Sequence, residues 1–236
     1  MNIYQIVKFK DNSAYATFWG CDWNCTYCIW KSQKWNICLP QDVRDELDRR
    51  WRENRIKFLE IDEFIKILKS NGVNLVFLGG GEPTLDPHLK DLLLALKSEK
   101  IESWIITNSE HLDDDIFELS KGLTMSLKAF DPDLHLKLTG HSNEEVIKNF
   151  KKFGQSSKIV AESVYSKGLV ECDEMIKIAT FLAGINKDMR FRIDPEVGGY
   201  QEIDDCIENV KEILPNTYRI KASGNIPPEL LYPEKE

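Results

Sequence analysis

The 236-residue sequence lacks a long apolar segment, since no run of hydrophobic residues is long enough to cross a lipid bilayer. It also lacks an excess of positive charge, because its formal net charge is −8. Proteins that bind nucleic acid over a broad surface neutralise phosphates with lysine and arginine. We therefore expect neither a membrane-embedded protein nor a large nucleic-acid interface.

Histidine is scarce as well. None of the four histidines, His88, His111, His135 and His141, has the spacing of a metal-binding pair. Residues 1–10 show no secretory signal, and clustered cysteines without such a signal are typical of a reducing compartment. We therefore predict a cytoplasmic protein.

Three of the six cysteines lie close together. Cys21, Cys25 and Cys28 have the spacing C-x3-C-x2-C in an expected loop. Three thiolates at this spacing suit a soft metal or an iron–sulfur cluster with one iron open to another ligand. A structural zinc ion would need a fourth Cys or His, and the nearest candidate is Cys38. A zinc-stabilised binding module without catalysis stays open as the alternative.

The cysteine spacing, with the aromatic Tyr27 just before the last cysteine, resembles the signature of the radical S-adenosylmethionine superfamily. The resemblance implies that Cys21, Cys25 and Cys28 hold a [4Fe-4S] cluster, whose open iron chelates the amino and carboxylate groups of S-adenosylmethionine. It implies an enzyme that generates a 5′-deoxyadenosyl radical, which abstracts hydrogen from a substrate. The implied partner is an electron donor such as ferredoxin or flavodoxin.

Strand and helix patterns alternate along the chain. After a leading strand at Ile3–Phe9, strands are expected at Ala14–Gly20, Val73–Leu78, Ser103–Thr107, Leu123–Lys128, Lys158–Val164 and Met189–Ile193. Helices are expected at Glu60–Ser70, Pro87–Lys97, Asp113–Ser120, Asp133–Leu138, Asn143–Phe153, Asp173–Ala183 and Gln201–Leu214. Alternation of this kind predicts parallel strands with right-handed crossovers. Six units are too few for a closed eight-unit barrel, so we predict an α/β fold with an open (β/α)6 partial TIM-type barrel, as the resemblance also implies.

We expect a single domain over residues 1–236, without internal repeats. A charged insertion covers about residues 31–57, with Lys31–Pro40 as a loop and Asp42–Lys57 as an arginine-rich helix. The helix is interpreted as a solvated face or, alternatively, as a docking surface for an acidic partner. The proline-containing tail, about residues 215–236, could add an edge strand at Tyr218–Lys221.

Polar residues gather where the predicted strands end, which is where α/β barrels place their active sites. Gly79–Glu82 follows one strand and Asn108 closes the next. On later strands, residues two apart share a face. These pairs are Ser126 with Lys128, Glu162 with Val164, and Arg192 with Arg190 and Asp194. We expect all of these sets to converge on one rim.

The glycines of Gly79–Gly81 would let a ligand approach the backbone closely. The run GGGEP resembles the superfamily's GGE motif, which implies that Glu82 receives the methionyl amino group. Thr107-Asn108 resembles a Thr-Asn pair of many members, although Asn108 could equally be a turn residue. Arg192 could bind a ligand carboxylate or pair with Asp194. The predicted cofactor-binding residues are Tyr27, Gly80, Gly81, Glu82, Asn108, Ser126, Lys128, Glu162 and Arg192.

Residues Met125–Lys128, with Asp131-Pro-Asp133 and Leu138-Thr-Gly140, resemble the glycyl-radical activating enzymes of the pyruvate formate-lyase type. That group uses an Asp-x-Lys pair to bind the ribose and carboxylate of S-adenosylmethionine, and this chain has Ser126 where Asp is usual. A buried Lys128 without a ligand would be costly. The resemblance implies a protein substrate, and the alternative is radical modification of a small molecule or RNA.

The remaining cysteines and the tryptophans near the cysteine loop lie outside these motifs. Cys38, Cys172 and Cys206 are scattered, so we expect ordinary buried cysteines, with a second cluster as the alternative. Four tryptophans flank the cysteine loop, namely Trp19, Trp23, Trp30 and Trp35. We expect them to pack, with shielding of the cluster as the alternative.

Overall fold

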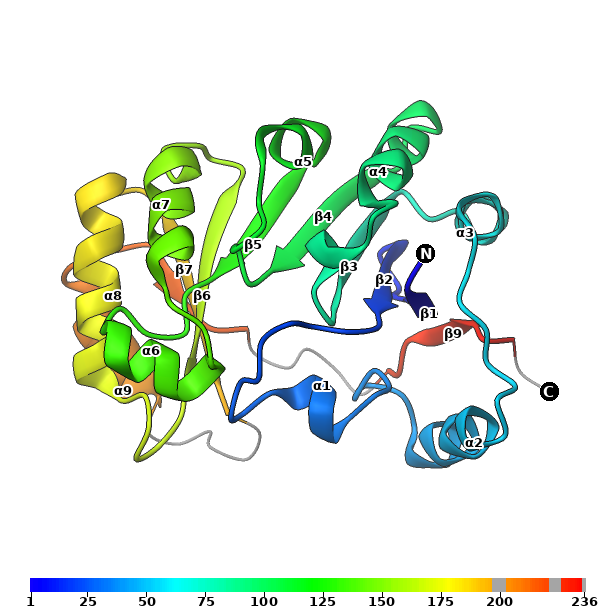
Figure 1. Ribbon diagram of the computed structural model, residues 1–236, viewed down its shortest axis with the longest axis horizontal. Helices are drawn as coiled ribbons and strands as arrows, with labels where there is room; N and C mark the ends of the chain where they lie inside the picture. Colours follow the sequence, from blue (N-terminus) through cyan, green and yellow to red (C-terminus); the bar gives the residue numbers. More distant parts are fainter. Residues whose placement is uncertain (197–202, 221–225, 235–236) are drawn as a thin grey trace.

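The computed structural model describes residues 1–196, 203–220 and 226–234, and its strands form one curved sheet (Figure 1). Within these residues the strand order is β8-β7-β6-β5-β4-β3-β2-β1-β9. The strands are β1 (Ile3–Lys8), β2 (Ser13–Phe18), β3 (Leu75–Gly80), β4 (Glu102–Thr107), β5 (Gly122–Ser126), β6 (Ile159–Tyr165), β7 (Arg190–Pro195), β8 (Thr217–Tyr218) and β9 (Glu229–Tyr232). Strands β2 to β8 are parallel, whereas β1 pairs antiparallel with both β2 and β9.

The predicted open partial barrel is confirmed, with β2 to β7 as its six strands. One boundary matters for the site: β5 ends at Ser126, so Lys128 lies two residues beyond the strand rather than within it. The leading strand is confirmed as β1. The edge strand predicted at Tyr218–Lys221 shares only Tyr218 with β8, because Arg219 and Ile220 are not in a strand and Lys221 lies outside the described residues. Strand β9 was not predicted, because pairing with β1 rather than a local pattern creates it.

Helices cover the outside of the sheet, as Figure 1 shows for α4, α5, α7 and α8. The helices are α1 (Ile29–Ser32), α2 (Gln41–Arg52), α3 (Ile61–Ser70), α4 (Leu89–Ser98), α5 (Asp114–Leu119), α6 (Pro132–Thr139), α7 (Glu144–Phe153), α8 (Cys172–Ile185) and α9 (Ile203–Lys211), with a 3-10 turn η1 (Pro83–Leu85). The expected helices exist, but the one predicted at Asp42–Lys57 already ends at Arg52 and the one predicted at Gln201–Leu214 ends at Lys211. Gln201 and Glu202 lie outside the described residues. Helix α1 lies partly in the segment expected to be a loop.

Helix α6 shows how local sequence places a loop beside the site. The Asp131 side chain accepts a hydrogen bond from the amide of Leu134, and Pro132 is the first helical residue. Both features favour a helix start. Gly140 ends the helix with φ of 80°, a left-handed conformation that glycine adopts without strain. The chain then turns back beside the cysteine loop, where the amides of Asn24 and Thr26 bond to the last carbonyls of the helix.

The hydrophobic core lies between the sheet and the outer helices. It includes fully buried side chains such as Leu78 of β3, Ile105 of β4 and Phe150 of α7. A second, smaller cluster forms around Tyr4 and contains Trp35, Leu47 and Leu230. The ring of Trp19 lies 5.8 Å from that of Tyr4 and 5.0 Å from that of Trp30. Together with the burial of Trp23, these contacts confirm the predicted packing role of the tryptophans.

The arginine-rich helix α2 is docked rather than fully solvated. Leu47 is buried, and Arg50, only 8% exposed, donates a 2.7 Å hydrogen bond to the carbonyl of Glu234. Arg49 is paired along the helix with Glu46 at 2.6 Å and Glu53 at 3.0 Å. The predicted docking surface for an acidic partner therefore loses two of its cations, because one is buried and the other is already neutralised.

The remaining cysteines differ from the expectation of ordinary buried thiols. Cys172 at the start of α8 forms a disulfide with Cys206 of α9, with the two Cα atoms 5.3 Å apart, and Cys38 is an exposed free thiol. The pairing follows from the packing of α8 against α9, which no local spacing reveals. Among the described residues, no helix has the length and apolar character that crossing a membrane requires.

A substitution in α2 tests whether this helix is a structural part of the barrel. We expect Leu47→Ala to lower the free energy of unfolding by about 2–5 kcal/mol, because truncating a buried leucine leaves a cavity. The control is Arg52→Ala, an exposed position on the same helix, where the change should stay within about 0.5 kcal/mol. Urea denaturation of the metal-free protein under reducing conditions measures both, and equal values would contradict the docked helix.

Candidate active site

A cavity of about 410 Å³ lies at the C-terminal ends of the strands. All twelve residues predicted as cluster or cofactor ligands line it, from Cys21 in the first loop to Arg192 on β7. Trp30 and the insertion residues Gln33 and Asn36 contribute further parts of the wall. The structure thus brings together residues from the strands and loops between β2 and β7.

The cysteine loop follows β2 directly, and its three thiols are free. Cys28 precedes α1, and the amide of Lys31 bonds back to the Cys28 carbonyl at 3.2 Å. Burial raises the pKa of Cys25, although Lys128 and Lys31 act in the opposite direction. Thiols that are neutral in the bare protein become thiolates on binding a metal, so ligation would release protons here.

The glycine turn after β3 packs against the end of β2. The Gly81 amide donates to the Phe18 carbonyl at 2.9 Å, and the Glu82 amide donates to the Gly20 carbonyl at 2.7 Å. A Cβ atom on Gly81 would lie 2.1 Å from the Gly20 oxygen. The missing side chain of Gly81 therefore leaves room for the Gly20 backbone, whereas the sequence suggested room for a ligand. As a result, the glycine turn lies next to Cys21.

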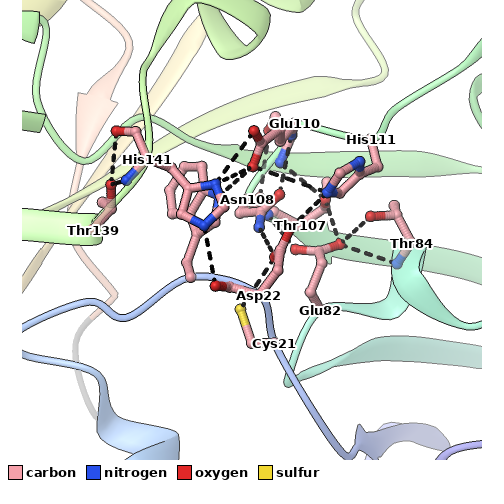
Figure 2. Close-up of polar contacts among 12 residues, drawn as sticks. Cys21, Asp22, Glu82, Thr84, Thr107, Asn108, Glu110, His111, Thr139 and His141 are labelled. Atoms are coloured by element: carbon pink, nitrogen blue, oxygen red, sulfur yellow. Dashed lines mark hydrogen bonds and ion pairs between the residues drawn. The ribbon is translucent and has the colours of Figure 1, made fainter. Parts of the chain in front are cut away.

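Glu82 is the most heavily bonded carboxylate of the cavity (Figure 2). One oxygen accepts from the Thr84 amide at 3.0 Å and from the hydroxyls of Thr84 and Thr107, each at 2.7 Å. The other accepts from the Asn108 amide at 2.6 Å. Burial nevertheless raises the pKa of Glu82 against these hydrogen bonds. A cation bound beside it would balance a buried negative charge, which is what a methionyl ammonium group could supply.

Asn108 has two roles at once. Its side-chain oxygen accepts a hydrogen bond from the Glu110 amide at 3.0 Å, which is the turn role considered from the sequence. Its side-chain nitrogen donates to the Asp22 carboxylate at 3.2 Å. The backbone bond to Glu82 and the side-chain bond to Asp22 place Asn108 between the cofactor-binding turn and the cysteine loop.

Lys128 and Glu162 form a buried ion pair across neighbouring strands. Their charged atoms are 3.1 Å apart, and the Ser126 hydroxyl also donates to the Glu162 carboxylate. Burial disfavours the charge of Lys128, but attraction from Glu162, with Tyr27 and Cys25 nearby, raises its pKa. Burial likewise opposes the charge of Glu162, yet Lys128 and Arg192 lower its pKa. Both groups therefore stay ionised and available to a zwitterionic ligand.

The structure pairs Arg192 with Asp194, whose atoms approach to 2.9 Å at the edge of the cavity. Burial raises the pKa of Asp194 against the attraction of Arg192. The expectation that Arg190 joins them at the rim is wrong. Arg190 begins β7 at the opposite end of the strand, where its guanidinium lies over the Trp104 ring at 5.7 Å.

The buried hydroxyl of Tyr27 indicates that the cavity suits a ligand. Its hydroxyl is buried and, among the described residues, has no hydrogen-bond partner, and burial raises its pKa. A buried polar atom without a partner is costly, and a ligand with acceptor atoms would satisfy it. With three free thiols for a cluster and the charged pairs for an amino acid moiety, the donor set fits a [4Fe-4S] cluster and S-adenosylmethionine.

Some residues at this site were missed by sequence reasoning. Thr84 was overlooked, although it lies two residues after Glu82 and a threonine there can bond to the carboxylate. Asp22, Glu110, His111 and His141 lie together beside Cys21, although the histidines lack ligand spacing in the sequence. No local signal identifies this group, because Asp22 and His111 are 89 residues apart in the chain.

The fold and the cysteine-lined cavity define a radical enzyme of the partial-barrel class, and comparison with known proteins agrees. The family profile of the radical SAM superfamily matches residues 16–182. The chain belongs to this superfamily, whose enzymes use a [4Fe-4S] cluster and S-adenosylmethionine. Membership of this superfamily of enzymes argues against the alternative of a zinc-binding module without catalysis.

The curated relatives include proteins named as activating enzymes and a GTP cyclase. A protein of Methanocaldococcus jannaschii, provisionally named a glycyl-radical enzyme activating enzyme, is 31% identical over 193 residues, or 79% of this chain and 68% of that protein. The pyruvate formate-lyase-activating enzyme of Staphylococcus epidermidis is 27% identical, with 88% of each chain covered. The GTP 3′,8-cyclase of Aquifex aeolicus is 28% identical over 78% of this chain and 56% of that protein.

Among solved structures, Streptococcus suis SuiB superposes with a TM-score of 0.62 at 22% identity. The match covers 86% of this chain and 47% of SuiB, so the present chain spans about half of that protein. At this identity the likeness concerns the fold alone, and it confirms the partial barrel.

Replacing single cysteines tests the assignment of the cluster ligands. Cys25→Ala should lose most of its iron and sulfide after anaerobic reconstitution, because two thiolates cannot hold a cluster that three thiolates bind. Cys38→Ala, which removes an exposed thiol outside the cavity, should keep both. Chemical iron and sulfide analysis gives the result, and parental iron content in Cys25→Ala would refute the assignment.

Proposed function

We propose that this enzyme abstracts a hydrogen atom from a glycine of a partner protein and thereby activates that protein. The observation that carries the proposal is the Ser126–Glu162–Lys128 group. Activating enzymes use a carboxylate and a lysine to hold S-adenosylmethionine, and Ser126 stands where the carboxylate is usual. Here Glu162 of β6 lies opposite Ser126 of β5, accepts a hydrogen bond from the Ser126 hydroxyl and pairs with Lys128.

The names of the relatives support the same conclusion. Two of them are activating enzymes, and the Staphylococcus epidermidis enzyme matches over 88% of its length. The cavity is also bordered by two half-exposed apolar side chains, Ile29 of α1 at 41% and Ile37 of the insertion at 50% exposure. Exposed apolar residues at the rim of a cavity suit contact with a protein segment.

The roles of the chain's own residues follow from their charges. When bound, the cluster and S-adenosylmethionine supply a 5′-deoxyadenosyl radical, which takes a hydrogen atom from the glycine Cα to give 5′-deoxyadenosine and a glycyl radical. In this proposal Glu82 binds the methionyl ammonium and Lys128 binds the carboxylate. Ser126 and Glu162 hold the ribose hydroxyls, and Tyr27 donates a hydrogen bond to the ligand.

The proposal includes the partners that this chemistry requires. A low-potential electron donor of the ferredoxin or flavodoxin kind would reduce the cluster. An exposed cluster and such a donor both suit a reducing compartment, so we place the enzyme in the cytoplasm. The formal charge of −8 gives no support to a nucleic-acid substrate.

Isotope transfer tests the proposed substrate before the partner protein has been identified. Cells of the host organism are grown with glycine deuterated at Cα, and their lysate is separated by gel filtration into macromolecules and small molecules. Incubation of each fraction with the reconstituted enzyme, S-adenosylmethionine and a reductant should yield deuterated 5′-deoxyadenosine with the macromolecular fraction. A lysate labelled with deuterated serine controls for scrambling of the label. Turnover with the small-molecule fraction alone would favour the small-molecule alternative.

Charge removal tests the placement of S-adenosylmethionine. Lys128→Ala and Glu82→Gln should each weaken its binding by about 2–5 kcal/mol, because each leaves a buried charge without its partner. Glu82→Gln keeps an oxygen acceptor for Thr84 and Thr107, which limits damage to the turn. The matched control is Lys121→Ala, an exposed lysine that directly precedes β5, the strand after which Lys128 lies. Equilibrium dialysis measures the affinities, and parental affinity in both variants would contradict the placement.

A further inference from the structure

Four polar side chains from two distant loops surround Asp22, the residue after Cys21 (Figure 2). The Asp22 carboxylate lies 2.6 Å from His111 Nε2 and accepts from Asn108 Nδ2 at 3.2 Å. The ring of His141 bonds to the Asp22 carbonyl at 3.1 Å and to the Glu110 carboxylate at 3.1 Å. Asp22 thus contacts the loop after β4 and the turn after α6 at the same time.

A continuous path of hydrogen bonds connects this group to the cofactor-binding turn. The Asp22 carboxylate accepts a hydrogen bond from the side chain of Asn108, and the backbone amide of Asn108 donates to Glu82 at 2.6 Å. The path therefore runs from the neighbour of a cluster ligand to the carboxylate proposed to bind the methionyl ammonium. Both bonds belong to the described part of the chain.

The cysteine loop is fixed on its other side as well. The Asn24 and Thr26 amides donate to the carbonyls of Thr139 and Leu138 at 2.8 and 2.9 Å. The Trp23 indole donates to Glu110 at 2.5 Å. These contacts hold the loop whether or not Asp22 is present, so the loop should keep its shape when only the Asp22 carboxylate is removed.

We propose that Asp22 is a positioning residue that couples the cluster-binding loop to the S-adenosylmethionine site through Asn108. Because the proposal rests on the placement of the cofactor at Glu82 and Asn108, it deepens the proposed function. The Asp22 carboxylate also lies 3.9 Å from the Cys21 thiol, but its 3.2 Å bond to Asn108 is the contact through which it acts on the cofactor site. Its removal should therefore weaken cofactor binding while leaving the three cysteines able to hold iron.

The two effects can be separated by a double-mutant cycle. The variants are Asp22→Ala, Asn108→Ala and the double variant, with Asp115→Ala as an exposed control that pairs with Lys90. All are reconstituted anaerobically, and three quantities are measured. These are the iron content, the dissociation constant for S-adenosylmethionine, and the EPR spectrum of the reduced cluster with and without the cofactor.

We expect parental iron content in Asp22→Ala and a dissociation constant raised about tenfold, as for a lost hydrogen bond to a charged group. The double variant should bind no more weakly than Asn108→Ala alone, because Asp22 acts through Asn108. Asp22→Asn should restore most of the affinity, since its amide oxygen can still accept from Asn108. The cofactor-induced change in the EPR spectrum should require a higher cofactor concentration in Asp22→Ala.

Four results would overturn the coupling. The first is a cofactor affinity of Asp22→Ala within twofold of the parent, and the second is that the affinity losses of the two single variants multiply in the double variant. The third is that Asp22→Ala loses iron together with cofactor affinity. The fourth is cofactor binding that depends on added Zn²⁺ or Mn²⁺ in the parent but not in Asp22→Ala. The last result would make Asp22, Glu110 and His111 a metal site instead, since their donor atoms lie within 4.8 Å of one another. If the parent itself binds no S-adenosylmethionine, the proposed function fails rather than the coupling alone.

Discussion

The close approach of two backbone segments, Gly20 beside Gly81, is the constraint on which the site depends. Strands β2 and β3 are parallel neighbours, and their pairing continues beyond the strand ends through the bonds of Gly81 and Glu82 to Phe18 and Gly20. No side chain fits between them. The cysteine loop and the Glu82 turn therefore leave the sheet at one point, and a cluster on the first lies next to a ligand on the second.

Balance of buried charge is the second organising feature. Among the described residues, the cavity is lined by four carboxylates, those of Glu82, Glu162, Asp194 and Glu196, but by only two cations, Lys128 and Arg192. Both cations contribute to the low pKa of Glu162, whereas the pKa of Glu82 is raised, with no cation next to it among the described residues. The cavity is thus suited to a ligand that brings positive charge to Glu82 and a carboxylate to Lys128. An amino acid with a sulfonium group has both.

Sequence reasoning identified residues that line one cavity where they belong to short motifs or to one strand. The three cysteines and Glu82 belong to short motifs, and Arg192 with Asp194 follows from the two-residue period of β7, whereas Lys128 lies in the cavity although β5 already ends at Ser126. It failed where contacts join distant segments. The disulfide of Cys172 with Cys206 depends on how α8 packs on α9, and the burial of Arg50 depends on the chain near Glu234. The reason given for the glycines was wrong for Gly81, because its missing side chain leaves room for the Gly20 backbone.

Electron-nuclear double resonance of the reduced enzyme, with S-adenosylmethionine labelled with ¹⁵N at its amino group, tests the central claim most directly. If the cysteine loop and the Glu82 turn hold the cluster and the cofactor side by side, the label should show a hyperfine coupling to the cluster. The coupling should be lost in Glu82→Gln at the same cofactor concentration. A reduced cluster of parental iron content that shows no ¹⁵N coupling at saturating cofactor would contradict the arrangement.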